Sequence, residues 1–252
     1  MNDLAQAIPA SEPLTETQRV LNVFVAPGKT FDDIRRKATF WGPLLILLVL
    51  SVAYSFTIQQ KVGWEQVFQN SIRQLPLAAQ NAAASQSETM KTAQVKIAEI
   101  ATYASSLLGL LFTAIIALVL WVTVNFGFGG KAKYGQVFAV SFYSWMVADI
   151  KFLLAIIALL AGLAPESFLL NNPVGSNIGY YLSTDTPLWI RSLCMHIDVF
   201  EIWGLVLTTI GISIIAKVSR GKAAAVVFGW WIVWILVKTA LTVLPALVAV
   251  KH

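Results

Sequence analysis

Five long apolar runs decide what this chain can fold into. They cover residues 41–59, 102–126, 137–163, 199–216 and 223–245. Each run is close to the roughly 20 residues that an α-helix needs to cross a hydrocarbon core of about 30 Å. We therefore predict an all-α fold, a polytopic membrane helix bundle with five transmembrane helices.

The composition excludes a water-soluble protein of this length. Hydrophobic residues make up 57% of the 252 residues and charged residues only 12%, whereas soluble domains hold about 45–50% and about 25%. So few charges cannot cover the surface of a soluble fold. The single cysteine, Cys194, excludes an intrachain disulfide and a zinc ribbon. Two histidines, His196 and His252, leave no HExxH protease site.

The distribution of lysine and arginine predicts the orientation of the spans. With the N-terminus inside, ten basic residues lie on short cytoplasmic segments and six on the opposite side, mostly in the long extracytoplasmic loops 60–101 and 164–198. The positive-inside rule favours this arrangement, so we expect the N-terminus in and the C-terminus out. The net charge of +5 then reflects membrane topology, and we expect no nucleic-acid partner.

A cytosolic N-terminal segment, residues 1–40, precedes the membrane domain, residues 41–252. The segment holds no apolar core of a signal peptide, so we expect the first apolar run to remain as a true span. A short helix is predicted over residues 15–26, and a second leads into the basic run 35–37. The apolar side of the first helix consists of Val20, Leu21, Phe24 and Val25. We interpret the segment as a membrane-surface anchor with its cations facing anionic lipid, or as a docking site for a cytosolic partner.

The two long loops also carry helical patterns. Apolar residues from Trp64 to Leu75 repeat at helical spacing, which predicts an amphipathic helix on the outer membrane face that ends at Pro76. Residues 77–87 are expected to be weakly structured. A capping pair, Ser85 and Glu88, then begins a helix that we expect to run unbroken into the second span. We expect the 164–198 loop to be irregular, and packing on the protein's own helices is the alternative for both loops.

Ionisable residues lie within or beside the predicted spans, where each costs about 2.5–3.5 kcal/mol at the membrane centre. They form a candidate intramembrane polar network of Asp149, Lys151, Asp198, Glu201 and Lys238. Asp149 and Lys151 are two residues apart, about 200° around a helix, so they cannot pair with each other. Each needs a partner on another helix, a kink or water, while Lys238 can reach Glu201 or extend outward. Two interpretations stay open: ion pairs that lock helices together, or a polar pathway for an ion, a proton or a lipid headgroup.

The sequence offers no convincing catalytic or metal site. Cys194, His196, Asp198 and Glu201 are the candidate metal ligands, but on a helix His196 points away from the face that the other three share. Three mixed ligands without a histidine suit a transition metal poorly. No nucleophile motif is present either. We therefore expect no metal, no cofactor and no catalytic residue.

Two stripes of small residues lie in the second and fourth spans. Small side chains let membrane helices approach closely. We therefore expect packing contacts at Ala101, Ser105 and Gly109, and at Thr208, Thr209, Gly211 and Ser213.

Several short patterns, taken with the five spans, give the chain a family resemblance. They are Phe24-x-x-Pro27-x-x-Thr30-Phe31-x-x-Ile34, Asn172-Pro173 to Asn177, Asp198-x-Phe200-x-x-Trp203 and Lys217-Val218-Ser219-x-x-Lys222-Ala223. In this order the chain, from about Arg19 to its end, resembles bacterial members of the Yip family of Ypt/Rab-interacting membrane proteins. The resemblance implies a five-span fold with a cytosolic N-terminus in the bacterial cytoplasmic (inner) membrane.

What the resemblance implies about activity is narrower. Eukaryotic members take part in vesicle transport and bind prenylated Rab-type GTPases, whereas bacterial relatives have no settled biochemical function. Trp41-Gly42-Pro43 matches the usual entry to the first span, but Thr39 stands where the acidic residue would be. The leading prediction is a non-enzymatic membrane organiser or adaptor, whose partners are the lipid bilayer and a membrane or cytosolic protein. The alternative is a small transporter or lipid-translocating protein that uses the intramembrane charges.

Overall fold

Helices form nearly all the regular structure in this computed structural model, which describes residues 12–75, 77–183 and 185–249. Five helices are long and apolar enough to cross a membrane. They cover Trp41–Lys61, Ser105–Gly127, Tyr134–Leu160, Val199–Ala216 and Arg220–Leu244. The prediction of an all-α bundle with five spans is confirmed, and its orientation in the membrane stays a prediction.

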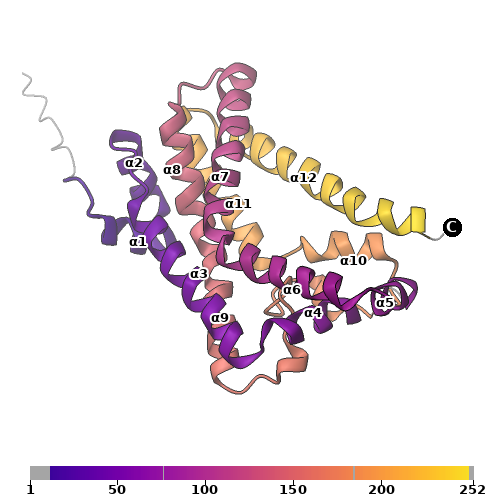
Figure 1. The fold of residues 1–252 in the computed structure, drawn as a ribbon. Helices are drawn as coiled ribbons and strands as arrows, with labels where there is room; N and C mark the ends of the chain where they lie inside the picture. Colours follow the sequence, from indigo (N-terminus) through magenta and orange to yellow (C-terminus); the bar gives the residue numbers. More distant parts are fainter. Residues whose placement is uncertain (1–11, 76, 184, 250–252) are drawn as a thin grey trace, which may run out of the picture.

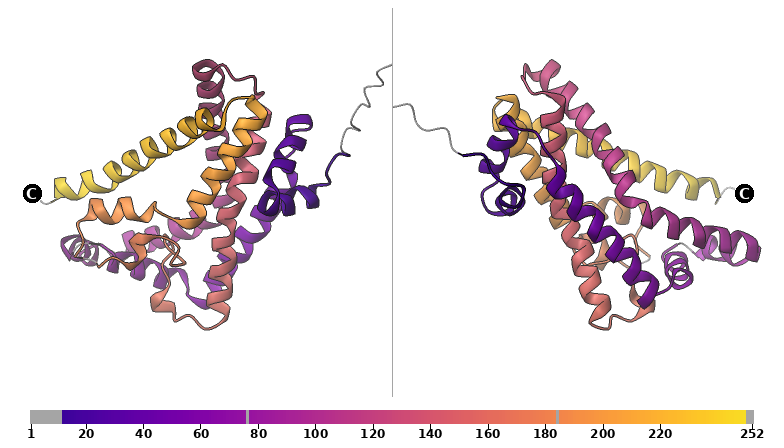
Figure 2. Two further views of the ribbon diagram at one scale, coloured as in Figure 1. Left: turned by 180° about the vertical axis from the view of Figure 1, so that it is seen from behind. Right: turned by 60° about the vertical axis from the view of Figure 1, so that its left-hand side comes forward.

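One span leaves the bundle that the others form. The bundle consists of α3 (Trp41–Lys61), α7 (Ser105–Val122), α8 (Tyr134–Trp145), α9 (Asp149–Leu160) and α11 (Val199–Ala216). α12 (Arg220–Ala249) begins beside α11 and then leans away from it, as Figures 1 and 2 show. α11 is the most buried of the five spans and packs against α8 and α12.

Glycine makes the close approach at the centre of the bundle possible. A Cβ atom at Gly211 of α11 would lie 2.4 Å from Val140 and 3.2 Å from Phe31. Because interiors are packed to the density of crystals, no larger residue fits there without displacement. The small-residue stripe of the fourth span therefore has the packing role expected of it at Gly211.

The third span is interrupted near its middle by a short 3₁₀ turn. α8 ends at Trp145, a 3₁₀ turn covers Met146–Ala148, and α9 begins at Asp149. Short 3₁₀ stretches inside helices mark hinges or functional positions. The break makes Asp149 the first residue of a new helix.

Two N-terminal helices, α1 (Glu16–Val25) and α2 (Pro27–Arg36), form an N-terminal hairpin that packs against α8 and α11. Thr15 caps α1 through a capping box with Gln18. The expected apolar side of α1 is divided. Val20 and Phe24 pack on the core, whereas Leu21 and Val25 are exposed.

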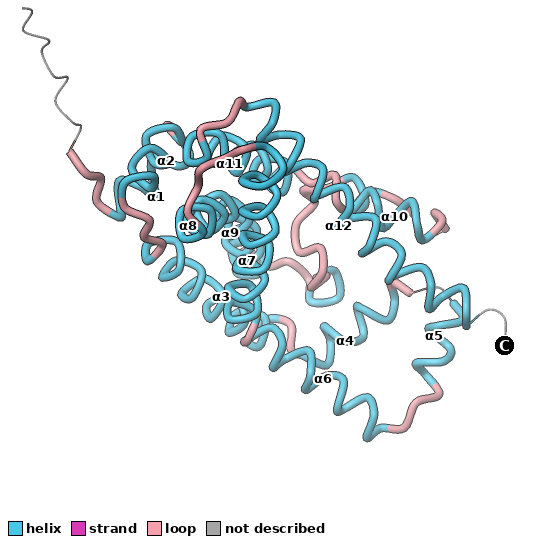
Figure 3. Tube along the Cα trace, turned by 90° about the horizontal axis from the view of Figure 1, so that it is seen from above, coloured by secondary structure: helices cyan, strands magenta, loops and turns pink. Residues whose placement is uncertain are grey.

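The segments between the spans are more helical than we expected. They include α4 (Trp64–Arg73), α5 (Leu77–Ala84), α6 (Glu88–Tyr103) and α10 (Leu188–Met195). Seen from above, these helices and α12 extend to the same side of the bundle (Figure 3). α4 is the predicted amphipathic helix, and its Trp64 and Val67 pack with Phe168 and α9 of the protein itself.

Four predictions for these segments are wrong. The 164–198 loop, expected to be irregular, contains the helix α10. Residues 77–84 form a helix, consistent with the high helix propensity of their alanines. The cap of α6 is Ser87, whose hydroxyl accepts from the Met90 amide, and not Ser85. α6 also does not run unbroken into the second span, because the helix is interrupted at Ala104 and α7 takes another direction (Figure 1).

Candidate functional site

A cavity of about 470 Å³ lies among the spans. Its walls come from α3, α7, α8, α9, α11 and α12, and from residues 170–173. Most of the lining is apolar and includes four tryptophans, Trp145, Trp230, Trp231 and Trp234. The few polar groups include Asp149, Lys151, Asn171 and Glu201. Both the volume and this mixture of apolar walls and a few polar groups are typical of small-molecule sites, which range over roughly 300–1,000 Å³.

Asp149 faces this cavity without a protein partner. Its residue is only 8% exposed, and in the described part of the chain its carboxylate has no hydrogen bond or ion pair. The break in the third span places it in the first turn of α9. The structure therefore holds an unpaired acidic group beside an open space.

Lys151, in contrast, has a partner from another helix end. Its Nζ lies 2.7 Å from Oδ2 of Asp198. Asp198 caps α11, and its Oδ1 accepts from the backbone amides of Phe200 and Glu201 at 2.9 and 3.1 Å. The Ser176 hydroxyl donates to its Oδ2 at 2.5 Å. Asp198 therefore joins α9, α11 and the 172–177 loop.

The surroundings of Asp198 favour its charged form. Burial acts to raise the pKa of this carboxyl, but the hydrogen bonds from Lys151, Ser176 and the Glu201 amide together lower the pKa below its ordinary value. Asp198 is thus an ionised carboxylate that is fixed by its contacts with Lys151, Ser176 and the Glu201 amide.

Glu201 interacts with an indole and a histidine. Trp231 Nε1 donates to Oε1 of Glu201 at 3.0 Å, and His196 Nδ1 lies 3.4 Å from Oε2. The expected pairing of Lys238 with Glu201 is not found among the described residues. Lys238 lies further along α12, where its ammonium is 5.9 Å from the ring centre of Trp234. Only Lys151 and Asp198 of the predicted five-residue network pair through their side chains, and Lys238 lies outside the cavity lining.

The wall of the cavity at residues 170–173 is held by a pair of asparagines. The Asn177 amide donates to Asn172 Oδ1 at 2.7 Å, and Asn177 also forms an isolated bridge with Asp198. We did not predict this pairing from the sequence. Two asparagines five residues apart beside Pro173 were its only signal.

The motif residues of the N-terminal hairpin dock it on α11. Phe24 contacts Trp203 edge to face, with the ring centres 5.7 Å apart. Pro27 occupies the first turn of α2, which its ring suits. Phe31 is fully buried and packs against the Gly211 position of α11.

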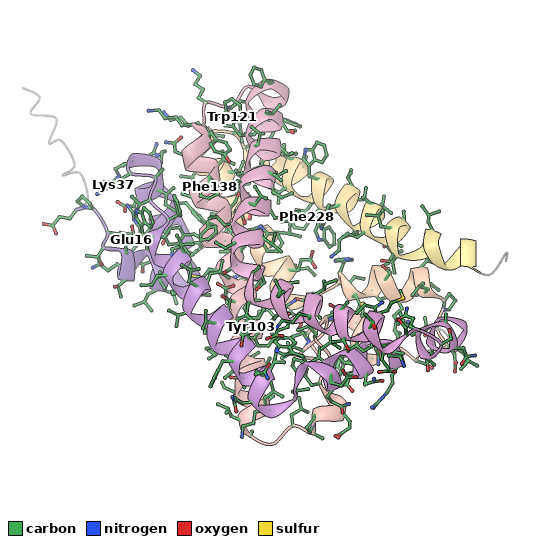
Figure 4. All side chains as sticks on the ribbon, in the orientation of Figure 1. Glu16, Lys37, Tyr103, Trp121, Phe138 and Phe228 are labelled. Atoms are coloured by element: carbon green, nitrogen blue, oxygen red, sulfur yellow. The ribbon has the colours of Figure 1, made fainter. Side chains whose placement is uncertain are left out.

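One polar cluster joins the two helices of the hairpin, and a second holds the hairpin to the bundle. Arg19 is 2% exposed and Asp33 3% exposed, and Arg19 Nε lies 2.7 Å from Asp33 Oδ2. Glu16 accepts from the Tyr143 hydroxyl at 2.5 Å, from the Gly42 amide at 3.2 Å and from the Thr39 hydroxyl. Glu16 and Phe228 of α12 lie on opposite sides of the bundle (Figure 4).

The charge of Glu16 is stabilised by its neighbours. Burial acts to raise the pKa of Glu16, but the hydrogen bonds from Thr39, Tyr143 and the Gly42 amide, with the nearby Arg19, lower the pKa below its ordinary value. The hairpin contact thus depends on an ionised glutamate.

Fold and cavity together define an integral membrane protein with five spans and a polar site within the membrane region. The Yip1 domain model matches residues 21–243, so the chain belongs to the Yip1 domain family. It is 22% identical over 227 residues to membrane protein YknW of Bacillus subtilis (strain 168), covering 88% of this chain and 90% of YknW. No solved structure matches the chain significantly. The resemblance found in the motifs is confirmed.

Proposed function

We propose that the protein is a non-enzymatic, lipid-translocating membrane protein that takes an amphipathic molecule from the bilayer into the cavity. The observation that carries this proposal is the unpaired carboxylate of Asp149 beside a tryptophan-lined space of about 470 Å³. Ionisable groups within spans usually mark substrate or ion pathways. A purely structural role for Asp149 would call for a protein partner.

The cavity has separate surfaces for the two parts of an amphiphile. Apolar side chains of α3, α7 and α12 suit an acyl chain or another hydrocarbon body, and Asp149 and Glu201 suit a headgroup. Both α7 and α12 line the cavity, and α12 leans away from the bundle (Figure 1). Large side chains bridge them, since the rings of Phe112 and Trp234 lie 5.0 Å apart.

The N-terminal hairpin favours a second candidate, the membrane organiser or adaptor. Its outer side exposes Leu21 and Val25, which are one helical turn apart, and Val25 is 80% exposed. Lys29, Arg35 and Lys37 are also exposed on the same hairpin. A cytosolic or membrane protein partner, or the lipid surface itself, fits this combination of apolar and basic groups.

A translocation assay separates the two candidates. The protein is reconstituted into vesicles that contain a fluorescent phospholipid, and the transfer of that lipid between leaflets is measured. Gly109→Phe fills the cavity, because Gly109 lines it and a Cβ there meets no atom within 4 Å. Gly135→Phe is the matched control, since Gly135 has the same open surroundings outside the cavity lining.

We expect transfer with the wild type and with Gly135→Phe, and slower transfer with Gly109→Phe. Transfer no faster than in vesicles without protein would overturn the proposal and favour the organiser. Equal rates for the two glycine variants would contradict the role of this cavity.

A further inference from the structure

Acidic side chains outnumber basic ones in the lining of the cavity. Asp149 and Glu201 line it directly, and the one lysine in the lining, Lys151, is neutralised by Asp198. His196 lies beside Glu201, and Lys238 lies by the ring of Trp234 at the edge of the lining. Asp149 and Glu201 are therefore acidic side chains of the lining without a lysine or arginine partner among the described residues, and Asp149 is only 8% exposed. An anionic headgroup would be repelled here, whereas a cation would complete the missing pair.

The tryptophans of the cavity are suited to the same kind of ligand. Trp231 donates its indole N–H to Glu201, and Trp230 donates its own to Thr123 at 2.9 Å. These two indoles therefore have no N–H left to donate to a ligand, and the remaining polar character of each ring is the negative charge density of its faces. Aromatic faces attract ammonium groups, quaternary ammonium above all. The contact of Lys238 with the Trp234 ring shows the same attraction at one edge of this aromatic group.

We propose that the cavity selects an organic cation, an amphiphile whose ammonium headgroup pairs with Asp149 among the tryptophan rings. This inference rests on the proposed function and names its ligand class. The shared chemistry is an ammonium group on an apolar body, which either a membrane lipid or a free lipophilic cation supplies. Asp149 supplies the counter-charge, and the hydrocarbon part occupies the apolar walls.

Three probes that share an eight-carbon alkyl chain but differ in headgroup test whether the cavity prefers an ammonium group. Octyltrimethylammonium, octanol and octanoate are titrated into the purified full-length protein in neutral detergent, and the quenching of tryptophan fluorescence is followed. We expect saturable binding of octyltrimethylammonium alone, and a loss of about tenfold in affinity in Asp149→Asn, which corresponds to about 1.4 kcal/mol. Asp149→Glu should retain binding because it keeps the charge. Glu166→Gln is the matched control, since this exposed acid lies outside the cavity lining.

The source of the ammonium group is tested by competition. The titration in neutral detergent is repeated with added phosphatidylethanolamine and, at the same concentration, with diacylglycerol, which has no charge and no ammonium group. Weaker binding of the probe only with phosphatidylethanolamine identifies a lipid headgroup as the ligand, and equal binding with both lipids identifies a free lipophilic cation. Either result supports the ammonium site.

Different results would overturn the ammonium inference alone and overturn both proposals. If octanol and octanoate bind as tightly as octyltrimethylammonium and Asp149→Asn binds like the wild type, the ammonium inference is overturned while the cavity remains a binding site. If no probe binds and Gly109→Phe behaves like Gly135→Phe in lipid transfer, both proposals are overturned.

Discussion

Buried acidic groups occur in two regions of this molecule, and they have a protein partner in one region but not in the other. At the N-terminal hairpin, Arg19 and Asp33 pair with each other in a closely packed contact. In the cavity, Asp149 has no partner and faces a space of about 470 Å³. A buried charge with its partner in place is a structural element, since breaking such a pair is costly. A buried charge beside an open space leaves room for a ligand to provide the partner. The predictions below test this contrast.

The largest effect is expected at the hairpin. Arg19→Met leaves Asp33 buried without its partner, so the free energy of unfolding should fall by about 3–5 kcal/mol. The melting temperature in detergent measures this loss. The double variant Arg19→Met/Asp33→Leu replaces both charges by apolar groups and should recover much of the stability. A wild-type melting temperature for Arg19→Met would show that the pair does not hold the hairpin.

Lys151→Met tests the paired charge at the cavity. Asp198 would lose one charged partner but keep the donors of Ser176, Phe200 and Glu201, and Lys151 is itself 26% exposed. The expected loss is therefore smaller, about 1.5–3 kcal/mol. The same melting experiment reports it. If Lys151→Met is as stable as the wild type, then Lys151, like Asp149, is not needed for folding.

Two glycines sharpen the contrast between packed and open surroundings. Gly211→Ala forces a Cβ against Val140 and Phe31 and should cost about 1–3 kcal/mol. Gly109→Ala faces the open cavity and should stabilise its helix by about 0.5–1 kcal/mol. Melting temperatures that shift in opposite directions support both assignments. A loss of stability in Gly109→Ala would mean that this part of the cavity is filled in the folded protein.

The smallest expected effect is a dependence on pH at the hairpin. The pKa of Glu16 in the folded state lies below the ordinary value of 4.5. Its contribution to stability is therefore complete above that value and is lost as the pH falls through the lowered pKa. The loss should be modest because the Glu16 side chain is 38% exposed. Glu16→Gln should show a weaker fall in melting temperature below pH 4.5 than Glu166→Gln, and identical falls would argue against the Glu16 contacts.

The parts of the fold that depend on membrane thickness could be predicted from the sequence. Each apolar run is long enough to cross a bilayer, so the number of spans follows from run length alone. The breaks at Ala104 and at Met146–Ala148 were not predictable in the same way, since no proline or glycine marks either position. Interruptions of this kind depend on how the surrounding helices pack.

Side-chain partners that are distant in the sequence could also not be predicted. Arg19 belongs to an amphipathic helix, where a lone arginine ordinarily faces water, and its partners Asp33, Glu16 and Thr39 explain its burial. Lys151 was expected to need a partner on another element, but nothing in the sequence identified Asp198, which lies 47 residues further on. The unpaired state of Asp149 became visible only when the partners of the other charges were known.

Thermal unfolding of Asp149→Asn with and without octyltrimethylammonium tests the central claim most directly. Without the ligand, Asp149→Asn should melt within about a degree of the wild type, because no protein group loses a partner. With the ligand, the wild type should be stabilised and Asp149→Asn should not, because binding to the folded state raises its stability by mass action. If Asp149→Asn melts several degrees below the wild type without ligand and both proteins respond equally to octyltrimethylammonium, Asp149 is a structural group and the account is contradicted.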